Sequence, residues 1–560
     1  MRHEYAIRLW ACLSLLLISW SSASAQEPCG PGTAVSELST NDVRAVLTNN
    51  GSLMWTDPAE PSPVYEVPKG SGSNAINTVS LWFGGMVGNE LRMSAGLYSD
   101  FELWPGPLDI EGQPAADCTP YDRIFNVSDD DIRQYDDTGI ATPDMLDWPW
   151  HLGAPVHDGD GDPHNYDLIG GDRPHVHGDQ TLWWILNDAG NRHLSTGTEP
   201  VGMEVRVTAF VSGSSDVWWV PYATLYRFEL VYRGSQPLED AFFGIFAETD
   251  LGNPDDDYIG SDSTRGLAFT YNGDNVDEGP FGYGSRPPAL GIRLIDGPTV
   301  DGDGVDNDRD GETDELGERL GLKKVFSFER NASVQGLPKY AYEFYYYLQA
   351  RYRDGTPMCS GWTINRGCPF HTEAANFIFP TDPPEYWSEE NIYADGTPNE
   401  PGDRRLLLST GPFRMDPGEY QEITAAILFV PGGPDRYEMI RWLHHAASHV
   451  RYLYPALSQF EIEQSEQYAT PGPDNFALGI HPKPAAEHVT LEFEIPVAGH
   501  VQITVLNVLG RRVLVPVEGV YGSGRHWVDV NLLGLAAGVY TARIEAHNVS
   551  GARSFVLAGS

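Results

Sequence analysis

Stretches in which every second residue is apolar recur through the middle of the chain. In residues 201–209 this alternation places the apolar side chains on one face, as in an antiparallel strand with one buried and one wet face. Runs rich in β-branched and aromatic residues predict strands at 79–83, 181–186, 202–211, 223–232, 241–247, 340–352 and 423–430. No helical pattern separates these strands. The chain is therefore predicted to be mainly β, with a large antiparallel β-sandwich domain.

One later segment has the period of an α-helix. Between residues 435 and 454, apolar side chains recur at steps of three and four. They are Ile440, Leu443, Ala447, Val450 and Tyr454. This spacing gives a single apolar face, so we expect one helix that packs on the edge of the sandwich or ends the domain.

Turn-rich segments divide the rest of the chain. Residues 26–74 are polar and contain closely spaced prolines, which disfavour regular strand pairing, and they are predicted to be an N-terminal extension. The large β-rich domain then covers 75–455. A linker rich in proline and glycine covers 456–475, and a compact second domain follows at 476–560.

The first residues have the pattern of an export signal. Two arginines precede an apolar run at 9–20, and Ala23-Ser24-Ala25 follows, which is the small-x-small pattern that signal peptidase cleaves. The apolar run is short, because spanning a bilayer takes about twenty residues. Residues 1–25 are therefore predicted to be a signal peptide rather than an anchor, and no later stretch is apolar enough to form a transmembrane segment.

The C-terminal segment carries strand patterns with a recognisable order. Alternating residues at 489–496, a strand and Leu-Gly-Arg turn at 499–513, and a glycine-led strand at 534–544 resemble a type IX secretion C-terminal sorting domain of type A. The resemblance implies a small Ig-like β-sandwich, export to the periplasm and passage to the cell surface or medium. It also implies the type IX secretion machinery as partner of residues 476–560. The alternative is an ordinary fibronectin-like module. Through the segments 80–85, 249–252 and 271–274 and the acidic repeat at 301–315, residues 75–455 resemble the uncharacterised large domains that often precede such signals.

Composition narrows the classes of partner. Aspartate and glutamate total 79 against 36 lysines and arginines, a formal net charge of −43, and 41% of residues are hydrophobic. The hydrophobic share disfavours wholesale disorder. So negative a surface repels phosphate backbones and anionic lipid, so nucleic acid is not expected as a partner, whereas divalent cations fit.

The densest acidic segment is residues 301–315. Its candidate ligands are Asp301, Asp303, Asp306, Asp308, Asp310, Asp314 and Glu315. Counted from Asp306, carboxylates fall at positions 1, 3 and 5, with Gly311 at position 6, as in an EF-hand loop. Position 12 is Gly317 instead of glutamate, so the loop resembles the calcium repeats of thrombospondin type 3 or dockerin kind more closely. It predicts bound calcium (Ca2+). The alternative is a solvated acidic loop.

Two other acidic loops follow the same logic with less regular spacing. One contains Asp158, Asp160 and Asp162. The other follows the strand predicted at 241–247 and contains Asp250, Asp255, Asp256, Asp257 and Asp262. Both are predicted to bind calcium, and the second could instead hold another ligand. Ordinary Asp-Gly turns or Asx capping are the alternatives.

Cysteines fit an exported protein. Cys12 leaves with the signal peptide, and the four that remain predict two disulfides in an oxidising compartment. Cys359 and Cys368 are close enough in sequence to close a short loop, and Cys29–Cys118 is then the remaining pair. A zinc site at these cysteines lacks the C-x-x-C spacing.

Histidine and tryptophan pairs offer weaker signals. His175 and His177 lie two residues apart and His445 and His449 four apart, which could place imidazoles together for zinc, but surface histidines are the simpler interpretation. Trp148, Trp150, Trp183, Trp184, Trp218 and Trp219 could stack on sugars or pack in the core. No nucleophile elbow, phosphate loop or dinucleotide fingerprint is present.

These features lead to three hypotheses. The first is a secreted or cell-surface, calcium-stabilised bacterial β-protein with a non-catalytic binding or adhesion role, for example toward an extracellular glycan or surface partner. The second is an extracellular hydrolase of polysaccharide or protein that uses the acidic loops. The third is a subunit of a surface filament. Catalysis predicts that Asp250–Asp262 and His175/His177 share one cleft, whereas a structural role predicts separate ion loops.

Overall fold

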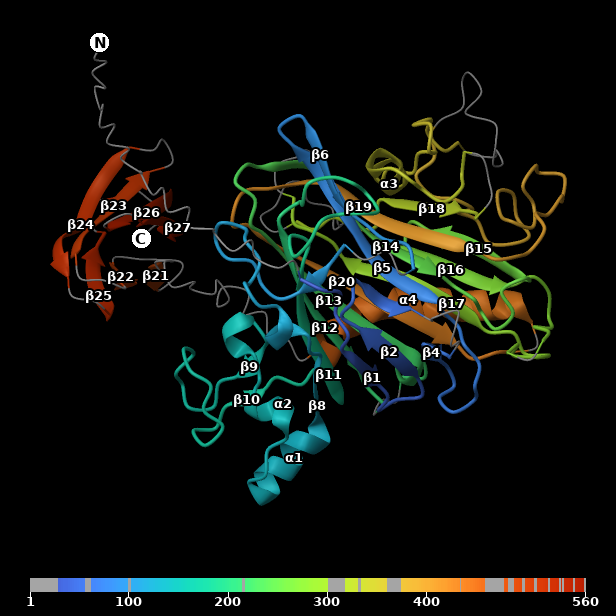
Figure 1. Ribbon diagram of the computed structural model, residues 1–560, viewed down its shortest axis with the longest axis horizontal. Helices are drawn as coiled ribbons and strands as arrows, with labels where there is room; N and C mark the ends of the chain where they lie inside the picture. Colours follow the sequence, from blue (N-terminus) through green and yellow to red (C-terminus); the bar gives the residue numbers. More distant parts are fainter. Residues whose placement is uncertain are drawn as a thin grey trace, which may run out of the picture.

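The computed structural model describes residues 29–55, 62–98, 102–213, 217–279, 281–300, 318–330, 334–359, 374–433 and 435–458 of the large domain (Figure 1). In the C-terminal domain it describes 478–557, apart from 482–487, 496–498, 508–510, 522–523, 533–534, 536–537 and 547–548. The predicted signal peptide at 1–25 lies outside these residues, as does the acidic segment 301–315.

A nine-stranded antiparallel sheet forms one layer of the large domain. In spatial order its strands are β15 (Asp257–Asp262), β16 (Leu267–Asn272), β17 (Ala289–Asp296), β20 (Tyr420–Val430), β13 (Ala223–Tyr232), β12 (Met203–Val211), β11 (Gln180–Asn187) and β7 (Trp104–Pro105), with β8 (Phe125–Ser128) also on β11. The last strand in sequence, β20, therefore lies in the middle of the sheet.

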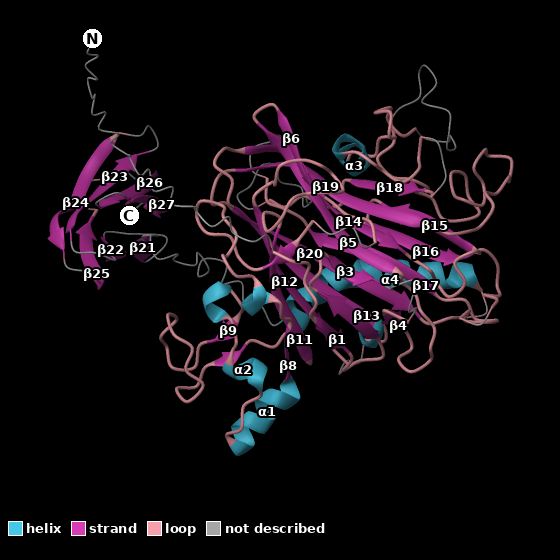
Figure 2. Ribbon diagram, in the orientation of Figure 1, coloured by secondary structure: helices cyan, strands magenta, loops and turns pink. Residues whose placement is uncertain are grey.

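A six-stranded sheet forms the opposing layer. Its order is β18 (Lys324–Phe328), β19 (Arg405–Met415), β14 (Leu238–Glu248), β5 (Thr78–Val87) and β3 (Ser52–Trp55), with β6 (Glu90–Ser94) also on β5. Phe228 of β13 and Phe243 of β14 meet between the layers, with ring centroids 5.6 Å apart. The predicted mainly β fold with an antiparallel sandwich is confirmed, and Figure 2 shows how few helices accompany the strands.

The outer face of the nine-stranded sheet is covered by helix α4 (Arg436–Ser458) and by residues before β11. Leu443 and Ala447 of α4 pack with Leu428 and Phe269 in one apolar cluster. Trp183 belongs to a second cluster on this sheet, whereas Trp184 belongs to the core between the sheets. The expectation of one wet face is therefore wrong: all nine residues of β12 are buried, because both faces of this strand are covered.

The segment predicted as a strand at 340–352 forms helix α3 (Ala341–Leu348) instead. Its buried side chains Phe344, Tyr347 and Leu348 recur at helical steps and pack over the six-stranded sheet, where Phe344 meets Trp82 with ring centroids 4.9 Å apart. Tyrosine and phenylalanine favour strands on average, but tertiary packing decides the state of such a short aromatic run.

Residues predicted as an N-terminal extension also differ from that prediction. They form β1 (Val35–Leu38), β2 (Arg44–Thr48) and β4 (Tyr65–Glu66), which make a small sheet, while β3 joins the sandwich beside β5. A disulfide joins Cys29 to Cys118, as predicted. Cys359 is disulfide-bonded as well, and Cys368 lies outside the described residues.

Smaller elements complete the large domain. They are α1 (Asp129–Thr138), α2 (Pro143–Leu146), and the two-stranded pair β9 (Val156–His157) and β10 (Arg173–Pro174). Helix α1 starts at a capping box, in which the side chain of Ser128 accepts from the amide of Asp131 and Asp131 bonds back to Ser128. Every helix in the described part of the chain is too short or too polar to cross a bilayer.

The C-terminal domain consists of two small sheets. One has the order β21 (Leu478–His481), β22 (His488–Ile495), β25 (Gly524–Asn531), and the other β24 (Arg512–Tyr521), β23 (Gly499–Asn507), β26 (Gly538–Ala546), β27 (Val549–Leu557). Side chains from both sheets, including Phe493, Ile503 and Ile544, form its apolar core. This agrees with the small β-sandwich implied by the resemblance of this segment.

Candidate functional site

The end of strand β14 places a buried glutamate opposite a buried arginine. Glu248 pairs in register with Arg405 of β19, and their side chains form an ion pair. Glu248 also accepts hydrogen bonds from the hydroxyl of Tyr98 (3.0 Å) and from Nδ2 of Asn77 (2.6 Å). Nε of Arg405 donates to the Tyr98 hydroxyl at 2.7 Å. Glu248 is therefore fixed in position by three neighbours.

Two further carboxylates gather beside this ion pair. One oxygen each of Glu248, Asp250 and Asp403 lies within 4.8 Å of the others. Asp403 Oδ2 is 3.0 Å from Nη2 of Arg405, whereas its buried Oδ1 has no hydrogen-bond partner. Burial, together with the charges of Glu248 and Asp403, raises the pKa of Asp250 to about 8. One arginine thus faces three carboxylates, which favours a proton or a cation among them.

The loop after Asp250 brings in more acid at the start of β15. Asp257 is fully buried, and its Oδ2 accepts from the amide of Leu251 at 3.0 Å while its Oδ1 has no hydrogen-bond partner. Burial raises the pKa of Asp257 well above its usual range, and Asp250, Asp256 and Asp277 raise it further. A fully buried carboxylate oxygen without a donor is costly, so its partner is expected to be a proton or an ion.

Asp256 and Asp277 complete this acidic loop. Burial and the charge of Asp277 raise the pKa of Asp256 to about 7. Asp277 accepts from the amides of Asn253 (3.1 Å) and Tyr283 (2.7 Å), which wraps the loop around it. Gly252 has φ +78°, and a Cβ there would lie 2.1 Å from Asp277 Oδ2, so this close approach requires glycine.

The structure separates the other residues predicted with this loop. Asp255 is exposed, with its amide bonded to Oδ1 of Asn253. Asp262 lies at the far end of β15, where it forms an ion pair with Arg265 and accepts from the hydroxyl of Thr264 at 2.6 Å. Of the five predicted ligands, the structure therefore brings Asp250, Asp256 and Asp257 together.

A second carboxylate cluster lies beside β9 and β10. Ligand atoms of Asp158, Asp160 and Asp172 lie within 4.8 Å of one another, and Asp172 is buried. Asp172 accepts from the amides of Gly159 (3.0 Å) and Asp167 (2.6 Å). Asp162 does not belong to this group of three, although its amide donates to Asp160 Oδ1 at 2.8 Å.

The predicted histidine pairs lie elsewhere. His177 is fully buried, with its ring 4.5 Å from that of His175 and 5.3 Å from Phe210 of β12. Its strand neighbour β11 is six strand positions from β15 in the nine-stranded sheet. At about 4.8 Å per strand this is roughly 29 Å, so His175/His177 and the loop at Asp257 do not share one cleft. His445 and His449 stack on α4, with ring centroids 4.1 Å apart.

Most of the tryptophans considered above as sugar-stacking candidates lie in the core. Trp148, Trp183, Trp184 and Trp219 are buried, and Trp218 is half-buried against Trp442 of α4. Both members of the Trp183–Trp184 pair are enclosed because each face of β11 is covered. The acidic segment 301–315 lies outside the described residues, and on either side of it Thr299 and Arg319 form an antiparallel bridge.

Comparison with known families accounts for the C-terminal domain. Residues 479–558 match the family described as "Secretion system C-terminal sorting domain". These residues are a sorting domain. This agrees with the resemblance to type IX secretion signals, and the sorting domain marks the chain as a secreted or cell-surface protein with the secretion machinery as its partner.

Structural comparison of the whole chain gives remote likenesses, among them the following two. One is to a polysaccharide lyase, at 9% identity and a TM-score of 0.25, covering 95% of this chain and 47% of that one. Another is to PorZ, described as a surface component of the type IX secretion system of Porphyromonas gingivalis, at 10% identity and a TM-score of 0.12, covering 70% and 44%. The chain thus spans about half the length of either, and likenesses this remote carry no functional conclusion. Comparison with proteins of curated function finds no match.

Sequence reasoning missed several members of both clusters. Glu248 and Asp403 are separated by more than a hundred residues and meet only because β14 pairs with β19. Asp277 and Asp172 likewise come from loops that carry no repeated acidic spacing. The aromatic run at 241–247 did place the loop that contains Asp250 at the end of a strand.

Proposed function

We propose that this protein is a secreted or cell-surface calcium-binding β-protein, exported by type IX secretion, with a non-catalytic binding or surface-structure role. The observation that carries the proposal is the gathering of Glu248, Asp250 and Asp403 within 4.8 Å around a single arginine. Calcium takes six to eight oxygen ligands, and carboxylates supply them.

Unsatisfied oxygens support a cation in this part of the fold. Asp257 Oδ1 and Asp403 Oδ1 are buried without donors, and Asp250 and Asp257 have raised pKa values because burial and neighbouring acids oppose their ionisation. A divalent cation would remove this repulsion and supply the missing partner. The carboxylates of Asp158, Asp160 and Asp172 form a second candidate site at the periphery.

The separation of the acidic loops favours a structural role for the cations. The Asp257 loop and the His175/His177 region lie on strands six positions apart, and the Asp158 cluster belongs to the β9–β10 pair rather than to that loop. Catalytic use of these groups together requires one cleft. Ions held in separate loops instead stabilise the framework that presents an extracellular binding surface.

Calcium titration tests this proposal directly. Thermal unfolding of the mature protein is expected to shift upward by several degrees with calcium, because an ion that binds the folded state stabilises it by mass action. Asp250→Asn should remove part of the shift. Asp255→Asn, in the same loop but exposed, is the matched control and should retain it. An identical melting temperature with calcium and with chelator would contradict the proposal.

Export is tested separately. Removing residues 476–560 is expected to leave the product in the periplasm, whereas the full chain reaches the surface or medium. The measurement is immunodetection of both forms in fractionated cells. Equal amounts of the truncated form outside the cell would contradict the role assigned to the sorting domain, and would leave the calcium proposal untouched.

One observation favours the hydrolase alternative. Asp250, with a pKa of about 8, holds a proton at neutral pH next to Glu248, whose pKa burial also raises, and a protonated carboxyl group beside a second carboxyl group is suited to acid–base chemistry. Hydrolysis of a polysaccharide or protein by the purified chain, lost in Asp250→Asn and retained in Asp255→Asn, would support this alternative over a non-catalytic role.

A further inference from the structure

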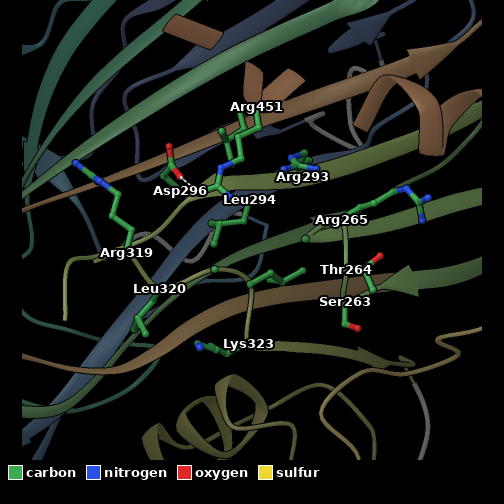
Figure 3. Close-up of a pocket in the computed structure, with 14 residues that line it drawn as sticks. Ser263, Thr264, Arg265, Arg293, Leu294, Asp296, Arg319, Leu320, Lys323 and Arg451 are labelled. Atoms are coloured by element: carbon green, nitrogen blue, oxygen red, sulfur yellow. Dashed lines mark ion pairs between the residues drawn. The ribbon is translucent and has the colours of Figure 1, made fainter. Parts of the chain in front are cut away.

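A small cavity lies where the C-terminal half of α4 crosses the ends of β15, β16 and β17. It has a volume of about 100 Å³ and is lined by the β15–β16 turn, the end of β17, residues 319–323 and Arg451 of α4 (Figure 3). It belongs to neither carboxylate cluster. Asp262, which sequence reasoning placed with the metal ligands, lies at its border through the ion pair with Arg265.

The lining of this cavity is basic. Five of the side chains around it are cationic, and Asp296 is the acidic one among the described residues that line it. The five are Arg265, Arg293, Arg319, Lys323 and Arg451. The chain has 36 basic residues against 79 acidic ones, so this concentration opposes the overall charge. A local excess of cations in an acidic protein points to an anionic ligand.

Arg293 is the central group. It is 7% exposed, its Nη1 donates to the carbonyl oxygen of Ala447, and its Nε is buried with no hydrogen-bond partner. No carboxylate in the described part of the chain lies within 4.0 Å of it. Burial lowers the pKa of Arg293 to about 10 and the charge of Arg451 lowers it further, while the charges of Asp296 and Asp262 partly offset this. Both carboxylates lie beyond ion-pair distance, so the buried guanidinium has an unused donor and no directly paired counter-ion.

The other arginines are already engaged. Arg265 pairs with Asp262 and donates from Nε to Ser448 Oγ at 3.0 Å. Arg319 donates to the carbonyl oxygens of Gly297 (3.3 Å) and Glu422 (3.1 Å). Arg451 lies 3.8 Å from Asp296, the pair marked by the dashed line in Figure 3. These contacts fix the cationic wall, while Arg293 is left without a direct ion pair among the described residues.

We propose that this cavity binds a tetrahedral oxyanion, a sulfate or phosphate group, either as the free ion or as an ester on a glycan. Such a group is compact, and its oxygens accept hydrogen bonds from guanidinium donors such as Nε of Arg293. Because salt screens exposed charges beyond about 8 Å, the remote acidic surface does little to repel an anion held here.

Calorimetric titration of the mature full-length protein with inorganic sulfate, at constant ionic strength in chloride, tests the site. We expect saturable one-site binding. Arg451→Gln should weaken it at least tenfold, and Arg293→Met should abolish it. Arg441→Gln is the matched control, because Arg441 is an exposed arginine of the same helix outside the cavity, and it should bind as the wild type does.

Parallel titrations with inorganic phosphate, dextran sulfate and unsulfated dextran distinguish the sources. Binding of an inorganic ion alone identifies a free oxyanion, and binding of dextran sulfate that is lost in Arg451→Gln identifies an ester group on a glycan. The proposal is overturned if none of the sulfated or phosphate probes binds, or if Arg451→Gln binds them as tightly as Arg441→Gln. Arg451 is partly exposed, so its variant tests the site independently of any change in the buried environment of Arg293.

Discussion

Strand β15 has an acidic loop at its first residue, Asp257, and a basic cavity beyond its last, Asp262. Each region contains a buried charged or ionisable group with an unused hydrogen-bonding atom: Asp257 Oδ1 at one end and Arg293 Nε at the other. Beside the acidic loop, Arg405 of β19 pairs with Glu248 and Asp403, whereas Arg293 has no acidic partner within ion-pair distance among the described residues. The net charge of the whole chain therefore does not predict which ligand either region can bind. The ion-pair and hydrogen-bond partners next to each buried group decide it.

The largest expected effect contrasts the two buried arginines. Arg405→Met leaves Glu248 and Asp403 without their cation, and breaking a buried pair in this way costs about 3–5 kcal/mol of the unfolding free energy. Arg293→Met removes a lone buried charge and, in sulfate-free buffer, should be neutral or stabilising by up to about 1 kcal/mol. Urea unfolding measures both.

An exposed arginine of the same strand provides the control. Arg414 of β19 pairs with Glu239 and Asp416 at the surface, and Arg414→Met should change the unfolding free energy by less than about 1 kcal/mol. Equal losses for Arg405→Met and Arg414→Met would remove the distinction between buried and surface pairs on which the comparison rests.

The next effect concerns protons in the acidic loop. The folded pKa of Asp250 is about 8, above the unfolded value near 4, so the folded state keeps a proton that the unfolded chain releases. With chelator present, the contribution of Asp250 to the free energy of unfolding is fully favourable below pH 4. It declines between pH 4 and pH 8, by on the order of 1.4 kcal/mol per pH unit at most.

Asp250→Asn should flatten this decline. Unfolding free energies at pH 5, 6, 7 and 8 measure it, with Asp255→Asn as the exposed control. If wild type and Asp250→Asn show the same pH dependence of the unfolding free energy, Asp250 ionises normally. The acidic loop would then differ from the basic cavity, which contains a buried ionisable group without an ion-pair partner.

The smallest effect is expected at the peripheral cluster. Asp160 is exposed, so Asp160→Asn should reduce the calcium-induced rise in melting temperature by less than Asp250→Asn does, since solvent already screens the repulsion there. Differential scanning calorimetry with and without calcium provides the comparison. A larger loss in Asp160→Asn would move the principal site from β14 to the β9–β10 pair.

Much of the sandwich could be read from local periodicity. Strands β12 and β13 follow an alternating pattern, β11 and β20 are runs of β-branched and aromatic residues, and helix α4 follows steps of three and four. Helix α3 could not be read this way, because its aromatic run satisfies strand propensity and only its packing on Trp82 selects the helix. The prediction of a solvent-exposed face for β12 was wrong for a related reason. The sequence of a strand does not show which other elements cover its two faces.

Of the acidic site, only the residues that lie close together in the sequence could be predicted. Asp250, Asp256 and Asp257 lie in one loop, and the acidic spacing identified them. Glu248 is the last residue of β14, and Asp403 lies just before the partner strand β19, more than a hundred residues later in the sequence. The basic cavity had no sequence signal, because its arginines come from a turn, a strand and a helix spread from residue 265 to residue 451.

The central place of β20 has a consequence for how the domain folds. This strand pairs with β13 and β17, and its Thr424 is the register partner of Arg227, almost two hundred residues earlier. Such high contact order slows folding, since a long loop must close before the pairing is gained. Until residue 430 is available, β13 and β17 each present an unpaired edge, so an incomplete chain is exposed to aggregation. The large domain is thus closed by one of its last segments, just ahead of α4.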